Sequence, residues 1–133
     1  MQLSALEDLL YTYIHDTTGL PQVLFPNACA KPKGDYVGVG MLNVGNETLN
    51  ILNTATRHEF LLQLDVATKR GRGLKKNTEY IDVLQERFKV GTVLQNATFA
   101  IEVVEAPTVT DFSEQAAAYY VRSLTIDIKC KGI

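Results

Sequence analysis

The sequence predicts an α+β fold, in which a mainly antiparallel sheet carries two helices packed on one face. Two segments have helical periodicity, and several others alternate apolar with polar residues as half-buried strands do. Only one predicted strand, Arg57–Lys69, leads directly into a helix, so the regular strand–helix alternation of a parallel sheet is missing. An antiparallel sheet with its helices on a single face suits this order of elements.

The first helix is predicted over Ala5–His15. Ser4 and Glu7 form a capping-box pattern, in which each side chain accepts a hydrogen bond from the backbone N–H of the other residue. One face of this helix is apolar and needs a core to cover it; its residues are Leu6, Leu9, Leu10, Tyr13 and Ile14. Gly19 and Pro21 follow and predict the end of the helix.

Two strands are predicted before residue 43. Three prolines within residues 21–32 confine any strand there to a sheet edge, which predicts a short strand followed by extended chain. Asp35–Asn43 has strand composition, and Gly38 and Gly40 share one face, where they leave room for close approach by another backbone. The Asn-rich residues 43–53 predict a loop or a loose hairpin tip.

The clearest strand and the second helix follow. In Arg57–Lys69, Phe60, Leu62, Leu64 and Val66 alternate with Leu61, Gln63, Asp65 and Ala67, so one face of this strand is predicted to be core. Asn77 or Thr78 is predicted to cap a helix that runs to about Phe88, and Gly91 ends it. Its apolar stripe consists of Ile81, Leu84 and Phe88, with Tyr80 alongside.

Two strands complete the predicted fold, Thr98–Val103 and Tyr119–Cys130. The last strand places apolar side chains on one face and polar ones on the other; the apolar set is Tyr120, Leu124, Ile126 and Ile128. Arg122 interrupts that apolar face near its start.

Composition excludes several classes of protein. With 133 residues, 46% hydrophobic and 21% charged, the chain predicts one globular domain, residues 1–133, and neither a disordered chain nor a fibre. It contains no apolar run of the ~18 residues that a membrane helix requires. Two cysteines, Cys29 and Cys130, are too few for a disulfide scaffold and predict a reduced cytosol as the place of synthesis.

The charge is unevenly distributed. The net charge is −2, but five of the 13 basic residues lie within eight positions: Lys69, Arg70, Arg72, Lys75 and Lys76. We call residues 69–76 the basic segment. The rest of the chain holds 8 basic and 15 acidic residues, a net charge of −7. The basic segment is either a solvated loop or a contact with an acidic partner surface or a nucleic acid backbone.

The sequence predicts no phosphate-binding, catalytic or metal site. Gly71 and Gly73 are separated by one residue, which matches neither the Walker nor the dinucleotide motif. His15 and His58 have no second His or Cys at metal-ligand spacing. Acids on the strands, such as Asp65, are expected on polar faces; Glu102 and Asp127 are the others. We therefore expect no enzymatic activity and no cofactor.

Short motifs follow one another in a recognisable order along nearly the whole chain. After the N-terminal helix they are Leu20-Pro21, Phe25-Pro26-Asn27, Pro32, Asp35-Tyr36-Val37, the strand Arg57–Val66, Lys69–Gly73, the helix Asp82–Phe88, Gly91-Thr92 and Tyr119–Asp127. In this order and spacing the chain resembles the tail terminator proteins of long-tailed bacteriophages.

The resemblance implies a structural virion protein without enzymatic activity. It implies a hexameric ring at the head-proximal end of the tail, which stops polymerisation of the tail tube and offers a joining surface to the head–tail connector. The implied partners are other copies of the chain, the tail tube protein, the connector protein and DNA passing through the ring lumen, with no membrane. The protein is then expected in the virion tail after synthesis in the host cytoplasm.

Two features of the residues suit a ring subunit. Ring closure needs two unlike patches on each subunit, and an acidic body with a basic segment supplies them. Long strands such as Arg57–Lys69 offer edges for sheet extension between subunits. We expect the basic segment to contact the tail tube, a neighbouring subunit or DNA in the lumen. The alternative function is a small nucleic-acid-binding domain that uses the same segment.

Overall fold

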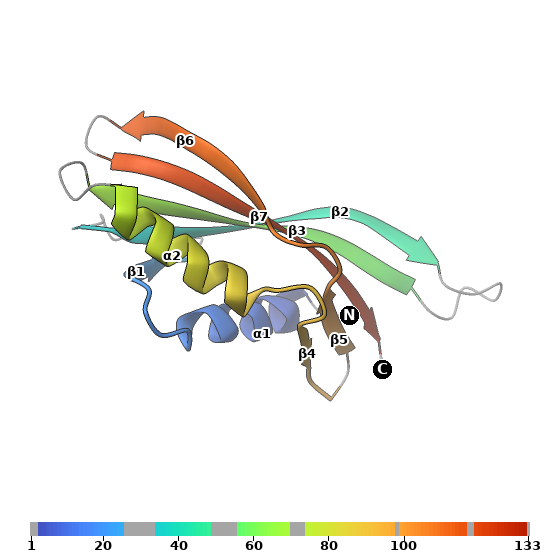
Figure 1. The fold of residues 1–133 in the computed structure, drawn as a ribbon. Helices are drawn as coiled ribbons and strands as arrows, with labels where there is room; N and C mark the ends of the chain where they lie inside the picture. Colours follow the sequence, from blue (N-terminus) through green and yellow to red (C-terminus); the bar gives the residue numbers. More distant parts are fainter. Residues whose placement is uncertain are drawn as a thin grey trace.

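The computed structural model describes residues 3–25, 34–48, 56–69, 74–97, 99–116 and 119–132. In it, one curved sheet is covered on one face by two helices (Figure 1). The elements in chain order are α1 (Leu3–His15), β1 (Gln22–Leu24), β2 (Tyr36–Thr48), β3 (Thr56–Lys69), α2 (Leu74–Arg87), β4 (Val93–Gln95), β5 (Phe99–Val103), β6 (Thr108–Ala116) and β7 (Tyr119–Gly132). The predicted α+β fold is confirmed.

The seven strands are ordered β1-β2-β3-β7-β5-β4, and β6 also pairs with β7. Only β1 and β2 are parallel; every other described pair is antiparallel. Strands β3 and β7 pair along nearly their full length, from Arg57 opposite Lys131 to Lys69 opposite Tyr119. Because β2 occupies the other side of β3, the expectation that β3 offers an edge to a neighbouring subunit is wrong.

Strands β5 and β6 form one interrupted run along the side of β7 that β3 does not occupy. Val103 at the end of β5 pairs with Ile128, and Thr108 at the start of β6 pairs with Thr125. The run therefore holds two more residues than β7 does between these pairs, which is a bulge, and Pro107 lies within it, where no ladder donor is required. Strand β6 pairs with β7 on one side, and its outer edge has no partner strand in the part of the chain that the structure describes.

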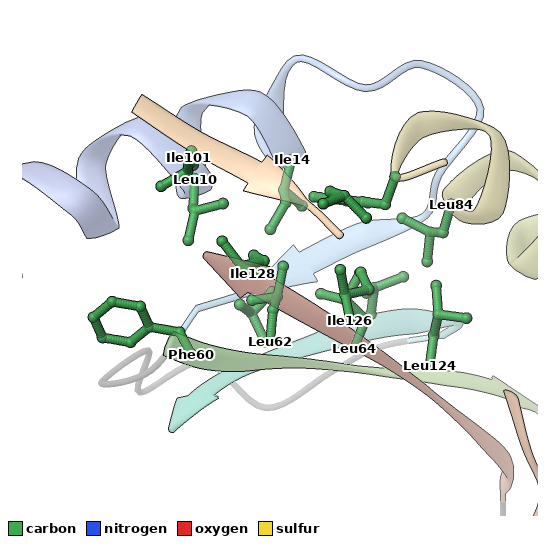
Figure 2. Packing of buried hydrophobic residues seen from close by; sticks show 14 of the residues in the cluster. Leu10, Ile14, Phe60, Leu62, Leu64, Leu84, Ile101, Leu124, Ile126 and Ile128 are labelled. Carbon is green, nitrogen blue, oxygen red and sulfur yellow. The ribbon is translucent and has the colours of Figure 1, made fainter. Parts of the chain in front are cut away.

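The core lies between the helices and the sheet (Figure 2). Leu10 and Ile14 of α1 and Leu84 of α2 face the alternating apolar side chains of β3 and β7, and all are at most 1% exposed. The sheet's contribution includes Leu62, Leu64, Leu124 and Ile126, each fully buried. Burial of each such side chain contributes roughly 1.5–3 kcal/mol. The predicted core positions are confirmed from Phe60 to Val66 and from Leu124 to Ile128, but Tyr120 is only half-buried. Near this end of the sheet Ala67 and Val121, predicted to lie on the other face, are buried as well.

The C-terminal ends of the two helices are tied together by Tyr13 and Arg87. The Tyr13 hydroxyl donates to the Arg87 carbonyl at 2.6 Å, and the Arg87 guanidinium lies 3.8 Å from the centre of the Tyr13 ring. Arg87 Nε also donates to Thr17 Oγ1 at 2.9 Å. Arg87 therefore anchors the turn after α1 as well as ending α2.

Three predicted boundaries are wrong: the starts of both helices and the end of β2. Helix α1 begins at Leu3, so Ser4 lies inside its first turn and does not cap it. Strand β2 continues to Thr48, so the first part of segment 43–53, predicted to be a loop or a loose hairpin tip, is strand paired with β3. Residues 49–53 lie outside the described part of the chain. Pairing with β3 outweighs the turn preference of the asparagines. Helix α2 begins at Leu74 instead of after a cap at Asn77.

Two strands were not predicted, β4 and β6. Strand β4 has only three residues, too few for a periodic pattern. Strand β6 has the sequence TVTDFSEQA, in which polar residues outnumber apolar ones, so no regular alternation of apolar and polar residues is visible. Its pairing with β7 supplies the stability that its own composition lacks.

Candidate interaction surfaces

The described members of the basic segment lie together at one end of the sheet. Lys69 ends β3, and Lys75 and Lys76 lie in the first turn of α2, with all three side chains exposed. Arg70 and Arg72 lie outside the described residues. Three of the five predicted contact residues are therefore placed, and they face solvent at the β3–α2 junction (Figure 1).

The lysines of α2 are placed against the helix dipole. The first turn of α2 contains Lys75 and Lys76 and no acidic residue. The N-terminus of a helix carries partial positive charge, so each cation there is unfavourable by roughly 0.3–1 kcal/mol. Lys76 is partly compensated, since its Nζ lies 3.6 Å from Glu79 Oε2 and 5.1 Å from the centre of the Tyr80 ring. The stability of α2 therefore does not explain why lysines occupy its first turn, and this holds most clearly for Lys75.

A buried carboxylate holds one end of the basic segment. Asp35 is 9% exposed, and its Oδ1 accepts a hydrogen bond from the backbone N–H of Lys69 at 2.9 Å. Its Oδ2 accepts one from the Tyr80 hydroxyl at 3.4 Å. Asp35 thus joins the end of β3 to α2.

The buried side-chain amide of Asn77, in α2, holds the other end of the basic segment. Asn77 is fully buried, and its Nδ2 donates to the Val66 carbonyl at 3.0 Å and to Thr68 Oγ1 at 3.3 Å. This residue, predicted to be a helix cap, is instead an anchor between α2 and β3. Sequence reasoning missed this role because an Asn before an apolar run is typical of an N-cap. The signal that could have found it is the position of Asn77 four residues before the core residue Ile81, on the same helix face.

On the sheet face without helices, the carboxylates outnumber the amines among the side chains that the structure describes. Side chains on this face come from the alternate positions of β3, β5 and β7 that point away from the core. Its charged residues include the carboxylates Glu59, Asp65, Glu102 and Asp127, the amine of Lys129, and Lys69 at its end. Lys129 Nζ lies 3.4 Å from Glu59 Oε1. The acids predicted on polar faces are therefore confirmed.

A depression of about 390 Å³ lies on this face, where β2 runs beyond the end of β1. Gly38 and Gly40 line it, together with the apolar side chains of Leu24, Phe25 and Leu61. Asp65 also lines it; its Oδ1 accepts hydrogen bonds from Gln63 Nε2 at 2.9 Å and from Ser123 Oγ at 2.6 Å. This depression combines apolar walls with one fixed carboxylate.

Neither a metal centre nor a reactive thiol is evident among the described residues. No group of three or more His, Cys, Asp or Glu side chains lies close enough to hold a metal ion in that part of the chain. Cys130 is buried, and burial raises the pKa of its thiol to about 11. No described helix is long and apolar enough to cross a membrane.

Comparison with known proteins gives a family and a fold. A family model described as phage tail terminator protein matches residues 3–127. A solved structure with 18% sequence identity superposes with a TM-score of 0.71, covering 96% of this chain and 91% of the other. At that identity the likeness concerns the fold alone. No curated protein matches the chain.

Proposed function

The chain belongs to the phage tail terminator family, so it is a structural protein of the bacteriophage tail, and we propose that it caps the tail tube. In this role it stops polymerisation of the tube and forms the joining surface to the head–tail connector. The observation that carries the proposal is the family match over residues 3–127, which leaves few residues at either end unmatched. The role is one of assembly, without catalysis.

The proposed working form is a homo-oligomeric ring, a hexamer by resemblance to the family, around a lumen through which DNA passes. Two of the sheet edges that have no partner strand among the described residues support it: β2 beyond Gly38, and β6; the outer sides of β1 and β4 are the others. The strand residues at these edges include no Lys and no Pro, the residues that commonly protect an edge from pairing with another chain. The two edges differ, so contacts between them are heterologous, as a ring requires.

Tube assembly in the presence of the purified protein tests this function. Tail tube protein is polymerised with and without equimolar chain, and tube lengths and end views are recorded by electron microscopy. We expect short tubes with closed rings at one end. A matched control is Leu64→Asp, which places a charge at a fully buried core position and removes the folded chain. Unchanged tube lengths, together with a wild-type chain that stays monomeric, would contradict the proposal.

A second candidate function is nucleic-acid binding by the basic segment. The observation that favours it is the pair of lysines placed against the dipole of α2. Charge reversal at Arg70 and Arg72 should then abolish binding to duplex DNA, and binding by the wild type should fall steeply with salt. Absence of binding at low salt would eliminate this candidate.

A further inference from the structure

We propose that the first turn of α2 in one copy of this chain docks against the surface at the C-terminal end of α2 in the next copy. The first turn, with Leu74, Lys75 and Lys76, is the donor end; the surface that includes Asp82 and Val90 is the acceptor end. The inference rests on the proposed ring, because it names two unlike surfaces through which neighbouring subunits would meet. Both surfaces are built from the described ranges 3–25 and 74–97.

The exposed large apolar side chains of the described residues gather at the two ends of α2, which runs from the end of β3 to the turn before β4 (Figure 1). Leu74, in the first turn, is 50% exposed, and Val90 and Val93, which follow the last turn, are 55% and 53% exposed. Elsewhere the large apolar side chains that the structure describes are buried or half-buried. Apolar surface left in solvent at both ends of one helix is typical of surfaces that a partner covers.

The two ends of α2 also carry opposite charge. Lys75 and Lys76 lie beside the positive end of the helix dipole, in a turn without an acid. Toward the other end, a groove of about 670 Å³ lies between α2 and the turn after α1, and its carboxylates are those of Asp16, Asp82 and Glu86. Helices α1 and α2 both end beside this groove, and each C-terminus adds partial negative charge.

The cations of the groove are engaged within their own chain. Arg87 donates to Thr17 Oγ1 at 2.9 Å and to the Tyr13 carbonyl at 3.3 Å, and its guanidinium lies over the Tyr13 ring. Lys89 Nζ lies 3.3 Å from Glu86 Oε1. These contacts leave the negative charge of Asp82 and of the two helix ends without a matching cation among the described residues.

Asp82 and Lys75 are each without an ion pair in the part of the chain that the structure describes. Both are exposed. An exposed ion pair alone contributes little. Here the apolar side chains stand beside the charges: Leu74 precedes Lys75, and Val90 and Val93 directly follow two lining residues of the groove. The donor end and the acceptor end are therefore complementary in charge and in apolar contact.

One copy cannot bring its own two ends of α2 together. The helix has 14 residues, so it is about 21 Å long at a rise of ~1.5 Å per residue. The complementary surface is supplied by a second copy, whose α2 then follows the first head to tail. Such a contact joins unlike surfaces, so it repeats from subunit to subunit and can close a ring.

Charge exchange tests the contact. Lys75→Glu and Asp82→Lys should each lower the ring population in mass photometry about tenfold at low salt, because each places like charges across the contact. The two changes together restore opposite charges and should recover the rings. Asp8→Lys is the matched control: Asp8 is an exposed residue within α1, outside the groove, and the change in charge equals that of Asp82→Lys. It should leave the rings intact.

Removal of apolar surface tests the other part of the contact. Val90 is exposed and lies outside the helices and strands, so Val90→Ser should fold as the wild type does by circular dichroism. Leu74→Ser changes an exposed residue at a helix start, where Ser is well tolerated. Each change should reduce the ring population. The double variant should lose less than the two single effects multiplied together, because both side chains act through one contact.

Three results would overturn the inference. They are wild-type ring populations from both single charge variants, lost rings that the combined exchange does not recover, and particles of only two copies, which would indicate an antiparallel pair of α2 helices. If the wild type forms rings only on tail tubes, the same variants are scored there by electron microscopy. In each of the three cases, normal shortening of tail tubes would leave the proposed capping function standing. A wild-type chain that neither forms rings nor limits tubes would instead refute that function itself.

Discussion

Replacing Lys75 by Glu should stabilise the folded chain, although it changes a residue that we place at a partner contact. Lys75 is exposed in the first turn of α2, beside the positive end of the helix dipole, and no acid precedes it in that turn. Removing an unfavourable cation and adding a favourable anion there are each worth roughly 0.3–1 kcal/mol, so Lys75→Glu should raise the free energy of unfolding by about 1 kcal/mol. For a chain of 133 residues this corresponds to a rise in Tm of about 3–5 °C.

The neighbouring residue supplies the contrast. Lys76→Glu makes the same change near the dipole but loses the contact with Glu79, places like charges three residues apart, and removes the cation from the Tyr80 ring. Those losses are roughly 0.3–1 kcal/mol each, so the net effect should be close to zero or destabilising.

Urea denaturation of both variants at low and at high salt measures the difference. The oligomeric state is held constant and checked by mass photometry. The gain from Lys75→Glu should shrink at 1 M salt, where the Debye length is about 3 Å. A destabilised Lys75→Glu chain, or a gain that is equal at both salt concentrations, would refute the assignment of Lys75 to a site that is electrostatically unfavourable for folding.

Three further predictions concern the fold. Arg87→Ala should lower the free energy of unfolding by about 1–3 kcal/mol in urea titration, since it removes the contact with the Tyr13 ring and the hydrogen bond to Thr17. Arg87→Lys should restore little of that free energy, because Lys lacks the planar guanidinium group. Full restoration of stability by Arg87→Lys would contradict this reasoning. Asp35→Ala should lower the free energy of unfolding by about 1–3 kcal/mol, because the Lys69 N–H and the Tyr80 hydroxyl lose the carboxylate that accepts from them. Asp35→Asn should lower it by less. Equal losses of stability in the two variants would argue against these hydrogen bonds. Burial raises the pKa of Cys130 to about 11 against an ordinary value of 9.0, so the unfolded chain releases this proton first and stability should fall as the pH rises from about 9 to 11; Cys130→Ala should lose that part of the pH dependence.

The sequence predicted the core strands well because their physical signal is local. In Arg57–Lys69 the alternation of four apolar residues fixes both the strand and its buried face, and the same is true of Leu124, Ile126 and Ile128. The predictions that failed concern strands whose stability depends on partners far along the chain. Strand β6 exists because β7 provides a ladder for it, and β2 continues past Asn43 because β3 does.

The interaction surfaces could be predicted only in part, because some of their features depend on residues far along the chain. The clustering of cations in residues 69–76 is visible in the sequence, but the cost of Lys75 appears only once α2 is known to begin at Leu74. Gly38 and Gly40 were predicted to leave room for another backbone, and in the structure a Cβ at Gly40 would meet no described atom within 4 Å, whereas one at Gly38 would make an ordinary contact with Asp65. Asn77 was assigned to a cap because its long-range partners, Val66 and Thr68, could not be inferred from its neighbours.

Lys75 and the glycines within the strands share one physical property: each lowers the stability of a single copy. A lysine at a helix N-terminus and a glycine within a strand are both unfavourable for one folded chain. Features that cost stability in the monomer are those expected of a subunit whose lowest free energy is reached only in an assembly. If that is correct, Gly40→Ala and Lys75→Glu should each stabilise the isolated chain while weakening the ring, and a variant in which both properties rise together would contradict it.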